Sequence, residues 1–226
     1  MHPALAPHAS RLAPLDAASL CDGCQAAGIP FGVIDPAIHL ISSGTKMIGV
    51  AHPVICERDF LEVWWAFHVG KPGEVLAIQA ADWAVVGELF THEAIHKDLA
   101  GIVIDGYARD LALVGPSPMP VYARGTNPRA GKATRATDGA ANALIGGVTV
   151  HAGDLLFGDR DGIVVIAPAH IADAIAAAEA VQAREAAILD RVQAGGSVFD
   201  HLEFDAYYRD RLAGKDVTLG LKLPTS

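Results

Sequence analysis

The sequence predicts a mixed α/β fold, organised as one domain with a helical C-terminal segment. Apolar runs of strand length, such as residues 75–78 and 162–166, alternate with longer segments that have the residue spacing of helices. The sequence contains no internal repeat and no linker long enough to separate independent domains. We therefore expect a single domain over residues 1–226, with a core of about 15–195 and a helical extension over 196–226.

The composition limits the class of protein. The chain has 226 residues, of which 51% are hydrophobic and 19% charged, as is typical of a globular protein with one sizeable core. Its formal net charge of −9 argues against a nucleic-acid-binding surface, which is normally basic. No apolar stretch has the length of a membrane span, the N-terminus lacks the pattern of a signal peptide, and three cysteines are too few for a disulfide framework. We expect a cytoplasmic protein with no nucleic-acid or membrane partner.

The first half of the chain alternates helical and strand patterns. Glycine and proline mark the ends of the predicted elements, and a segment rich in Trp and Phe indicates a buried helix. The expected elements are a helix over residues 14–27, ended by Gly28 and Pro30; a strand over 47–55; a helix over 60–69; and a strand over 75–78.

The second half continues the same alternation. The short apolar run over residues 102–104 is continuous, which fits a strand covered on both faces of its sheet. Pro168 is expected to open a long helix that Gly195 and Gly196 end. The other expected elements are a helix over residues 87–99, strands over 102–104 and 121–123, a loop over 124–141, and strands over 146–150 and 162–166.

Two short segments contain the candidate site. Residues 87–90 (Gly-Glu-Leu-Phe) open a predicted helix, and twenty residues separate Glu88 from the pair Arg109–Asp110, which follows a predicted buried strand. Backbone N–H groups at the start of a helix bind carboxylates readily, and arginine adds a planar fork for the same anion. A single aspartate can hold a magnesium ion that keeps most of its waters. These residue types together predict a site for a small keto acid.

The predicted loop over residues 124–141 contains four basic residues in an otherwise acidic protein. We expect this loop either to attract a polycarboxylate substrate or to be an ordinary solvated loop, and the sequence favours neither. The four residues are Arg124, Arg129, Lys132 and Arg135.

Several of these segments resemble the RraA-like family, which includes 4-hydroxy-4-methyl-2-oxoglutarate/4-carboxy-4-hydroxy-2-oxoadipate aldolases and the regulator of ribonuclease activity A. The resemblance extends from about Leu15 to Gly195, and two runs are specific in combination, residues 104–110 and 153–166. The other matching segments are Leu20-Cys21-Asp22, Gly87-Glu88-Leu89 and residues 123–129.

The resemblance implies a swivelling β/β/α fold, a homotrimer or homohexamer, and an active site at the subunit boundary. It implies that Asp110 holds Mg²⁺ or Mn²⁺ and that Glu88 acts through a water on that ion. It also implies that Gly87, the amides of Leu89 and Phe90, and Arg109 hold the pyruvyl group of a keto-acid substrate. The catalytic residues would then be Arg109, Glu88 and Asp110.

Two positions depart from the patterns of this family. Aspartate is the expected aldolase residue where this chain has Glu88. Some relatives outside the aldolases have an acidic residue three positions after the aspartate of the pair, where this chain has Leu113. The leucine disfavours a site built on that second carboxylate, so Glu88 remains the expected acid.

The expected function is a metal-dependent carbon–carbon lyase that releases pyruvate from a 4-hydroxy-2-keto di- or tricarboxylic acid and also decarboxylates oxaloacetate. The alternative from another class is a non-catalytic regulator that binds a ribonuclease or helicase. In a purely structural interpretation, Arg109 and Asp110 form a surface ion pair and Glu88 is a solvated first-turn residue.

Two further motifs compete with this interpretation. The segment His92-Glu93-Ala94-Ile95-His96 matches the His-Glu-x-x-His pattern of zinc peptidases, but no third ligand follows at a familiar spacing. Cys21 and Cys24 have the spacing of a redox or metal pair, but no second pair completes a zinc site. We expect both motifs to be ordinary helix positions.

Overall fold

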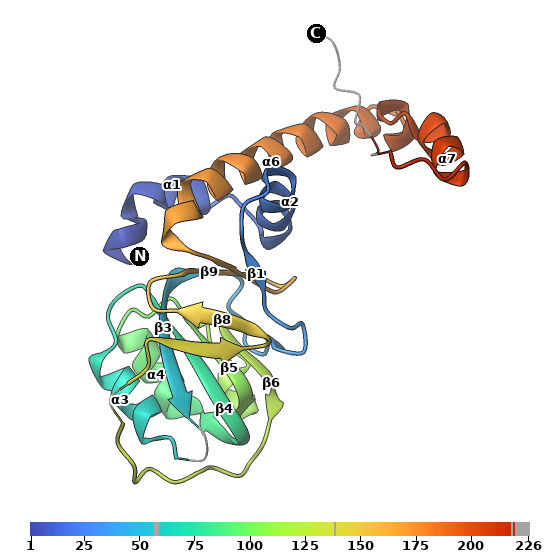
Figure 1. The fold of residues 1–226 in the computed structure, drawn as a ribbon. Coiled ribbons are helices and arrows are strands. Elements are labelled where there is room, and N and C mark those ends of the chain that lie inside the picture. The colour runs from blue at the N-terminus through green and yellow to red at the C-terminus, as the bar shows by residue number, and fades with distance from the viewer. Residues whose placement is uncertain (57–58, 138, 218, 220–226) are drawn as a thin grey trace. The chain divides into compact units, whose positions relative to one another are not determined.

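The computed structural model describes residues 1–56, 59–137, 139–217 and 219. The chain divides into two compact units, Met1–Ala178 and Glu179–Ser226. The first unit contains the sheet and most of the helices, and the second contains the remainder of one long helix with two shorter ones (Figure 1). Part of the predicted C-terminal extension, residues 218 and 220–226, lies outside the described residues.

An eight-stranded sheet forms the centre of the first unit. Its order is β1-β10-β9-β3-β4-β5-β6-β2; the pairs among β3, β4, β5 and β6 are parallel, and the other pairs are antiparallel. A separate hairpin pairs β7 with β8. The strands are β1 (Gly32–Val33), β2 (His39–Leu40), β3 (Met47–Cys56), β4 (Glu74–Val86), β5 (Gly101–Ala108), β6 (Val121–Thr126), β7 (Asn142–Ile145), β8 (Val148–His151), β9 (Leu155–Gly158) and β10 (Ile163–Ile166).

The helices of the first unit are short, except for the last one, which continues into the second unit. Asp16 caps α2 by accepting a hydrogen bond from the amide of Ser19 at 2.7 Å, and Gly28 ends that helix in the left-handed conformation. The helices are η1 (Pro3–His8), α1 (Ala9–Leu12), α2 (Ala17–Ala27), α3 (Leu61–Val69), α4 (Glu88–His96), α5 (Leu111–Val114), η2 (Pro168–His170) and α6 (Ile171–Gln193).

Side chains of the central strands alternate between two cores. Leu76 and Ile78 of β4 pack in the cluster that includes residues of α3 and α4, whereas Val75 and Ala77 pack in the cluster that includes residues of β7 and β8. Successive strand residues point to opposite faces, so both faces of the sheet are covered. The result is a hairpin layer, a sheet and a helical layer (Figure 1), which confirms the predicted mixed α/β class.

A third core lies where β9 and β10 meet the helices α1, α2 and the start of α6. Gly23 allows α2 to approach α6 closely, because a Cβ atom there would lie 2.6 Å from the backbone nitrogen of Ala178. This packing buries Leu12 and Leu20 completely. It also explains η1 and α1, which precede the first helix that the sequence predicted.

The second unit consists of helical segments alone among its described residues. Besides the end of α6, it contains η3 (Val198–His201) and α7 (Phe204–Leu212). The ring of Phe204 contacts the rings of Phe199 and Tyr208, with centroids 5.1 and 6.0 Å apart. In neither unit does a described helix combine the length and apolar character needed to cross a membrane.

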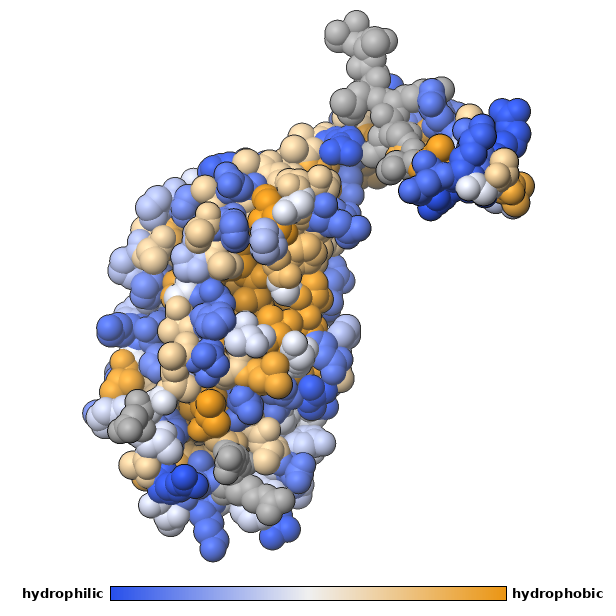
Figure 2. Space-filling model, viewed as in Figure 1, coloured by the Kyte–Doolittle hydropathy of each residue, from blue (hydrophilic) through white to orange (hydrophobic). Residues whose placement is uncertain are grey.

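Apolar side chains gather in the middle of the face that carries the β7–β8 hairpin, with hydrophilic side chains around them (Figure 2). Exposed hydrophobic residues of the strands include Val33 in β1 and Leu144 in β7, with exposed fractions of 49% and 51%. Exposed apolar patches commonly mark protein interfaces. The homotrimer or homohexamer remains a prediction, and this face is one that such an assembly could cover.

Candidate functional site

The candidate site forms where two parallel strands end at the same edge of the sheet. β4 pairs with β5 in parallel, and Val86 lies opposite Ala108. The residues that follow, Gly87 and Arg109, are therefore neighbours, and the amide of Arg109 donates a 2.9 Å hydrogen bond to the carbonyl of Val86. Parallel pairing thus brings the two predicted segments together although they are far apart in the sequence.

Asp110 has an unusual backbone conformation. It is in the left-handed region with φ 57° and ψ 40°, directly before α5. Its Oδ2 atom accepts a 3.3 Å hydrogen bond from the amide of Glu88 and lies 3.5 Å from Nε of Arg109. Left-handed conformations of non-glycine residues are uncommon and often occur at functional sites. The turn directs this carboxylate toward the start of α4.

Gly87 makes this close approach possible. A Cβ atom at this position would overlap with Oδ2 of Asp110 and lie 2.9 Å from Cγ of Arg109. Gly87 is the N-cap of α4 and has no side chain to cap it, so the Asp110 carboxylate receives the first amide instead. An aspartate from the neighbouring strand end therefore caps this helix.

A cavity of about 130 Å³ lies beside this turn. At about 30 Å³ for each water of the liquid, it has room for roughly four waters or a small organic acid. Its lining includes two charged residues, Arg109 and Asp110, and three aromatic residues, Phe60, Trp64 and Phe90. The cavity is lined by Phe60, Trp64, Ala84, Val85, Val86, Gly87, Leu89, Phe90, Arg109, Asp110 and Ala130.

The structure brings together five of the six predicted site residues around this cavity. Glu88 is the exception, because its amide binds Asp110 while its half-buried side chain is not among the cavity lining. The sequence did not identify Phe60, Trp64 and Ala130 as part of the site. Trp64 was expected in a buried helix, but it is 42% exposed and lines the cavity.

The side chains that could act as metal ligands beside the cavity fit a hydrated divalent ion. Within the described parts of the chain, no group of three or more His, Cys, Asp or Glu side chains is arranged to hold an ion. The Asp110 side chain is 40% exposed, which suits a Mg²⁺ or Mn²⁺ ion held by one carboxylate with waters and substrate as its other ligands. Residues here therefore fit a hydrated divalent ion and not a caged zinc ion.

The two competing motifs occupy ordinary helix positions. His92 and His96 are both exposed on α4, and among the described residues no third His, Cys, Asp or Glu forms a metal-binding group with them. Cys21 and Cys24 lie in α2 as free thiols, and burial raises the pKa of Cys21 to about 11. A thiol with so high a pKa is a poor nucleophile at neutral pH.

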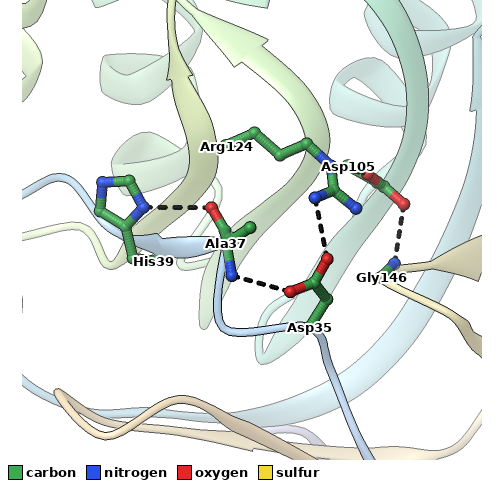
Figure 3. A network of polar contacts seen from close by, with 6 residues as sticks. All are labelled: Asp35, Ala37, His39, Asp105, Arg124 and Gly146. Atoms are coloured by element: carbon green, nitrogen blue, oxygen red, sulfur yellow. Dashed lines mark hydrogen bonds and ion pairs between the residues drawn. The ribbon is translucent and has the colours of Figure 1, made fainter.

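Arg124 is engaged in an internal ion-pair network and lies in β6, not in a loop (Figure 3). Its Nε lies 2.5 Å from Oδ1 of Asp105, and its NH1 lies 3.0 Å from Oδ2 of Asp35. Asp105 also accepts a 2.7 Å hydrogen bond from the amide of Gly146. Hydrogen bonds to the carboxylates of Asp105 and Asp35 raise the pKa of the Arg124 guanidinium above its ordinary value. The network ties the β7–β8 turn to the sheet.

The other three cations of the expected basic loop also lie away from the cavity. The guanidinium of Arg129 lies over the ring of Trp83, 4.4 Å from its centroid. Lys132 and Arg135 line a different cavity of about 440 Å³, which also contains Asp59 and the buried Glu62. None of the four basic residues of this segment is among the lining of the cavity, which favours the interpretation as an ordinary segment over that of a substrate-attracting loop.

Asp59 anchors the segment that follows Ala130. Its Oδ2 accepts hydrogen bonds from the amide and hydroxyl of Thr134, at 2.8 and 2.5 Å, and its Oδ1 accepts the amide of Leu61 at the start of α3. These hydrogen bonds, that of the Thr134 hydroxyl above all, lower the pKa of Asp59 to about 2. The carboxylate therefore fixes the loop against α3, next to Phe60, which lines the cavity.

We expect this anchor to fail in acid. The pKa of Asp59 in the folded protein lies below its value of about 3.9 in the unfolded chain. The stability that the ionised carboxylate contributes is therefore complete above about pH 4 and is lost as the pH falls through about 2. Exchange of the Thr134 amide hydrogen, corrected for its intrinsic rate, should accelerate as the pH falls from about 4 to about 2. In the Asp59→Ala variant this exchange should already be fast at pH 7. Asp82→Ala is the control, because Asp82 holds Asn127 through its backbone carbonyl. Equal protection of Thr134 in both variants would contradict the anchor.

The fold and the site define a protein of the aldolase/RraA class. The family model described as Aldolase/RraA matches residues 17–165, so the chain belongs to the RraA-like family. The resemblance seen in the sequence is confirmed.

Three similar proteins illustrate this relationship. The chain is 32% identical over 165 residues to the "Putative 4-hydroxy-4-methyl-2-oxoglutarate aldolase" of Halalkalibacterium halodurans, covering 70% of this chain and 79% of that protein. A solved structure of an uncharacterized Pseudomonas syringae protein matches with a TM-score of 0.75 and 28% identity, covering 84% and 90%. Streptomyces coelicolor RraAS2, of the RNase ES inhibitor RraA family, matches with a TM-score of 0.67, covering 80% and 94%; at 24% identity it shows the fold alone.

Proposed function

We propose that this protein is a divalent-metal-dependent lyase that releases pyruvate from a 4-hydroxy-2-keto acid and also decarboxylates oxaloacetate. The observation that carries the proposal is the position of Arg109 and Asp110, which line a small cavity together with the opening turn of α4. Membership of the aldolase/RraA family supports it.

The pyruvyl carboxylate would bind beside Arg109 and the first turn of α4. The amides of Leu89 and Phe90 lie in the first turn of α4, where a helix leaves its N–H groups without intrahelical acceptors. The guanidinium of Arg109 adds a planar pair of donors for the same anion. These groups would orient the substrate with its keto oxygen toward Asp110.

Cleavage of the bond between C3 and C4 leaves an electron pair that must become the enolate of pyruvate. A Mg²⁺ or Mn²⁺ ion held by Asp110 would supply a Lewis acid for that charge. Arg109 would hold the enolate carboxylate throughout the reaction. Loss of carbon dioxide from oxaloacetate gives the same enolate, so one site would serve both reactions.

Glu88 is the proposed acid–base residue, and it would act through a water because its side chain is not among the cavity lining. Aldol cleavage needs a base for the 4-hydroxyl proton and an acid that protonates the enolate carbon, and general acid–base catalysis contributes roughly 10²–10⁴-fold. Glu88 is in the first turn of α4, adjoining the amides that would hold the substrate, and its side chain is half-buried. A carboxylate at this position is also favoured by the helix dipole.

The proposal is tested by assaying pyruvate release from 4-hydroxy-4-methyl-2-oxoglutarate and from oxaloacetate. We expect turnover with added Mg²⁺ or Mn²⁺ and its loss with a chelator. Absence of turnover with any divalent metal would contradict the lyase. It would instead favour a non-catalytic binding role like that named for the Streptomyces relative, which a pull-down of a ribonuclease or helicase would test.

A further inference from the structure

The segment that follows β6 is tied to the rest of the first unit along its length. We call residues 127–134 of this segment the strap. The side-chain amide of Asn127 donates a 2.7 Å hydrogen bond to the carbonyl of Asp82 in β4, and Asp59 accepts hydrogen bonds from the amide and the hydroxyl of Thr134. The strap is therefore anchored to the sheet at its start and to the segment before α3 at its end.

Two backbone hydrogen bonds of the strap lie on either side of Ala130. The amide of Ala84 donates to the carbonyl of Arg129 at 2.9 Å, and the amide of Phe60 donates to the carbonyl of Lys132 at 2.7 Å. Ala84 and Phe60 both line the cavity, so these bonds join the strap to two parts of the cavity wall. Breaking them would leave backbone amides without their acceptors, which is costly. Ala130 is therefore held at the cavity and does not move away easily from a ligand.

Ala130 is the residue that the strap contributes to the cavity lining. It is partly buried, and it also forms an isolated β-bridge with Ala84, so two alanines lie next to each other in the wall. The cavity of about 130 Å³ has room for roughly four waters, at about 30 Å³ each. In so small a space, additional carbon atoms on the wall occupy room that a ligand would otherwise fill.

In the proposed complex, the carboxylate and the keto oxygen of the substrate bind beside Arg109, Asp110 and the first turn of α4. The carbons beyond the keto group then lie among the rest of the lining, which includes Phe60, Ala84 and Ala130. A cavity of this size holds the pyruvyl group and the first atoms attached to it, whereas the outer part of a longer substrate extends beyond it. The wall that contains Ala130 therefore limits the space beside C4.

From these observations we infer that Ala130 is a specificity-determining residue of this site. Its small side chain leaves room for a substituent on C4 of the substrate. A larger side chain at this position would exclude a substituted C4 while still admitting pyruvate. The inference rests on the proposed function for the reaction, and on the strap and the cavity for the size limit.

The size limit is measured first by binding, with keto acids that cannot undergo aldol cleavage. Pyruvate, 2-oxobutanoate and 2-oxopentanoate share the pyruvyl end and lengthen by one carbon at a time from C4 outward. Calorimetric titrations with Mg²⁺ present give the ratio of the Kd of 2-oxopentanoate to that of pyruvate. Ala130→Val should raise this ratio at least about tenfold over that of the unsubstituted protein, and Ala130→Gly should lower it by more than about twofold. A ratio that stays within about twofold in both variants would overturn the inference.

A second alanine of the same segment provides the matched control. Valine suits position 130 because Ala130 has the extended backbone of a β-bridge, which accommodates β-branched side chains. Ala136 is exposed and lines a different cavity, so Ala136→Val should leave the ratio within about twofold. An equal rise in the two valine variants would overturn the inference. Ala130→Gly decides alone if circular dichroism shows that Ala130→Val is unfolded.

Turnover then separates this inference from the proposed function. 4-Hydroxy-4-methyl-2-oxoglutarate and 4-hydroxy-2-oxoglutarate differ by a methyl group on C4, and Ala130→Val should lower kcat/KM at least about tenfold more for the methyl compound. An equal fall for both compounds would overturn the inference and leave the lyase intact. The expected changes in the binding ratio without pyruvate release from either compound would support the size limit and refute the lyase. Failure of all three keto acids to bind would contradict both.

Discussion

Replacement of Asp110 by asparagine should lower metal-dependent pyruvate release about a thousandfold while the fold is retained. A metal ion that stabilises an enolate contributes several kcal/mol, and each 1.4 kcal/mol corresponds to a tenfold change in rate. Asparagine tolerates the left-handed conformation with φ 57° and can still accept the amide of Glu88, so the change removes the charge and little else. The measurement is kcat/KM as a function of Mg²⁺ concentration.

Asp98→Asn is the matched control for this prediction. Asp98 is the other non-glycine residue with positive φ among the described residues, at 54°, and its side chain is exposed at the turn before β5. Its replacement tests whether asparagine in this backbone conformation affects activity by itself, and we expect no change. Asp110→Asn with more than a tenth of the normal activity would contradict the proposed metal ligand.

Arg109→Ala should lower kcat/KM about 10²–10³-fold, the usual effect of removing a group that stabilises a developing oxyanion. The free energy of unfolding should change by less than about 0.5 kcal/mol, because the Arg109 side chain is 44% exposed and its pair with Asp110 is weak. Arg109→Lys keeps the charge but loses the planar fork, so it should recover only part of the activity.

The exposed Arg160, in the turn between β9 and β10, provides the control for Arg109. Arg160→Ala removes the same charge from the protein without touching the cavity, and it should retain full activity. An equal loss of kcat/KM in the Arg109→Ala and Arg160→Ala variants would mean that the change in net charge, and not the loss of anion binding by Arg109, lowers the activity. An active Arg109→Ala would favour the structural interpretation, in which Arg109 and Asp110 are only a surface pair.

The sequence predicts the centre of this fold well because burial leaves clear patterns there. The strands that begin at Met47 and Gly101 and the helix that begins at Leu61 agree with apolar runs of the right length. The predicted ends of the strands were less accurate where hydrogen bonding between neighbouring strands decides the structure. β4 extends to Val86 because β5 continues beside it, and β7 forms at 142–145 because Gly146 and Gly147 make the hairpin turn, which we had assigned to a strand.

The polar half of the site could be predicted because its residues lie in two short segments. Parallel pairing of β4 with β5 then brings these segments together without any further assumption. The aromatic half depends on tertiary packing of α3 against α4, which no local pattern in the sequence specifies. For the same reason the sequence left open whether Arg124 attracts a substrate or belongs to an ordinary loop, since its partners Asp35 and Asp105 are distant in the chain.

A crystal structure of the protein with pyruvate and Mn²⁺ would test the central claim most directly. We expect the anomalous signal of the ion at the Asp110 carboxylate, and the pyruvate carboxylate between Arg109 and the amides of Leu89 and Phe90, with its methyl group toward Trp64. An ion at His92 and His96, or pyruvate bound away from the start of α4, would contradict it.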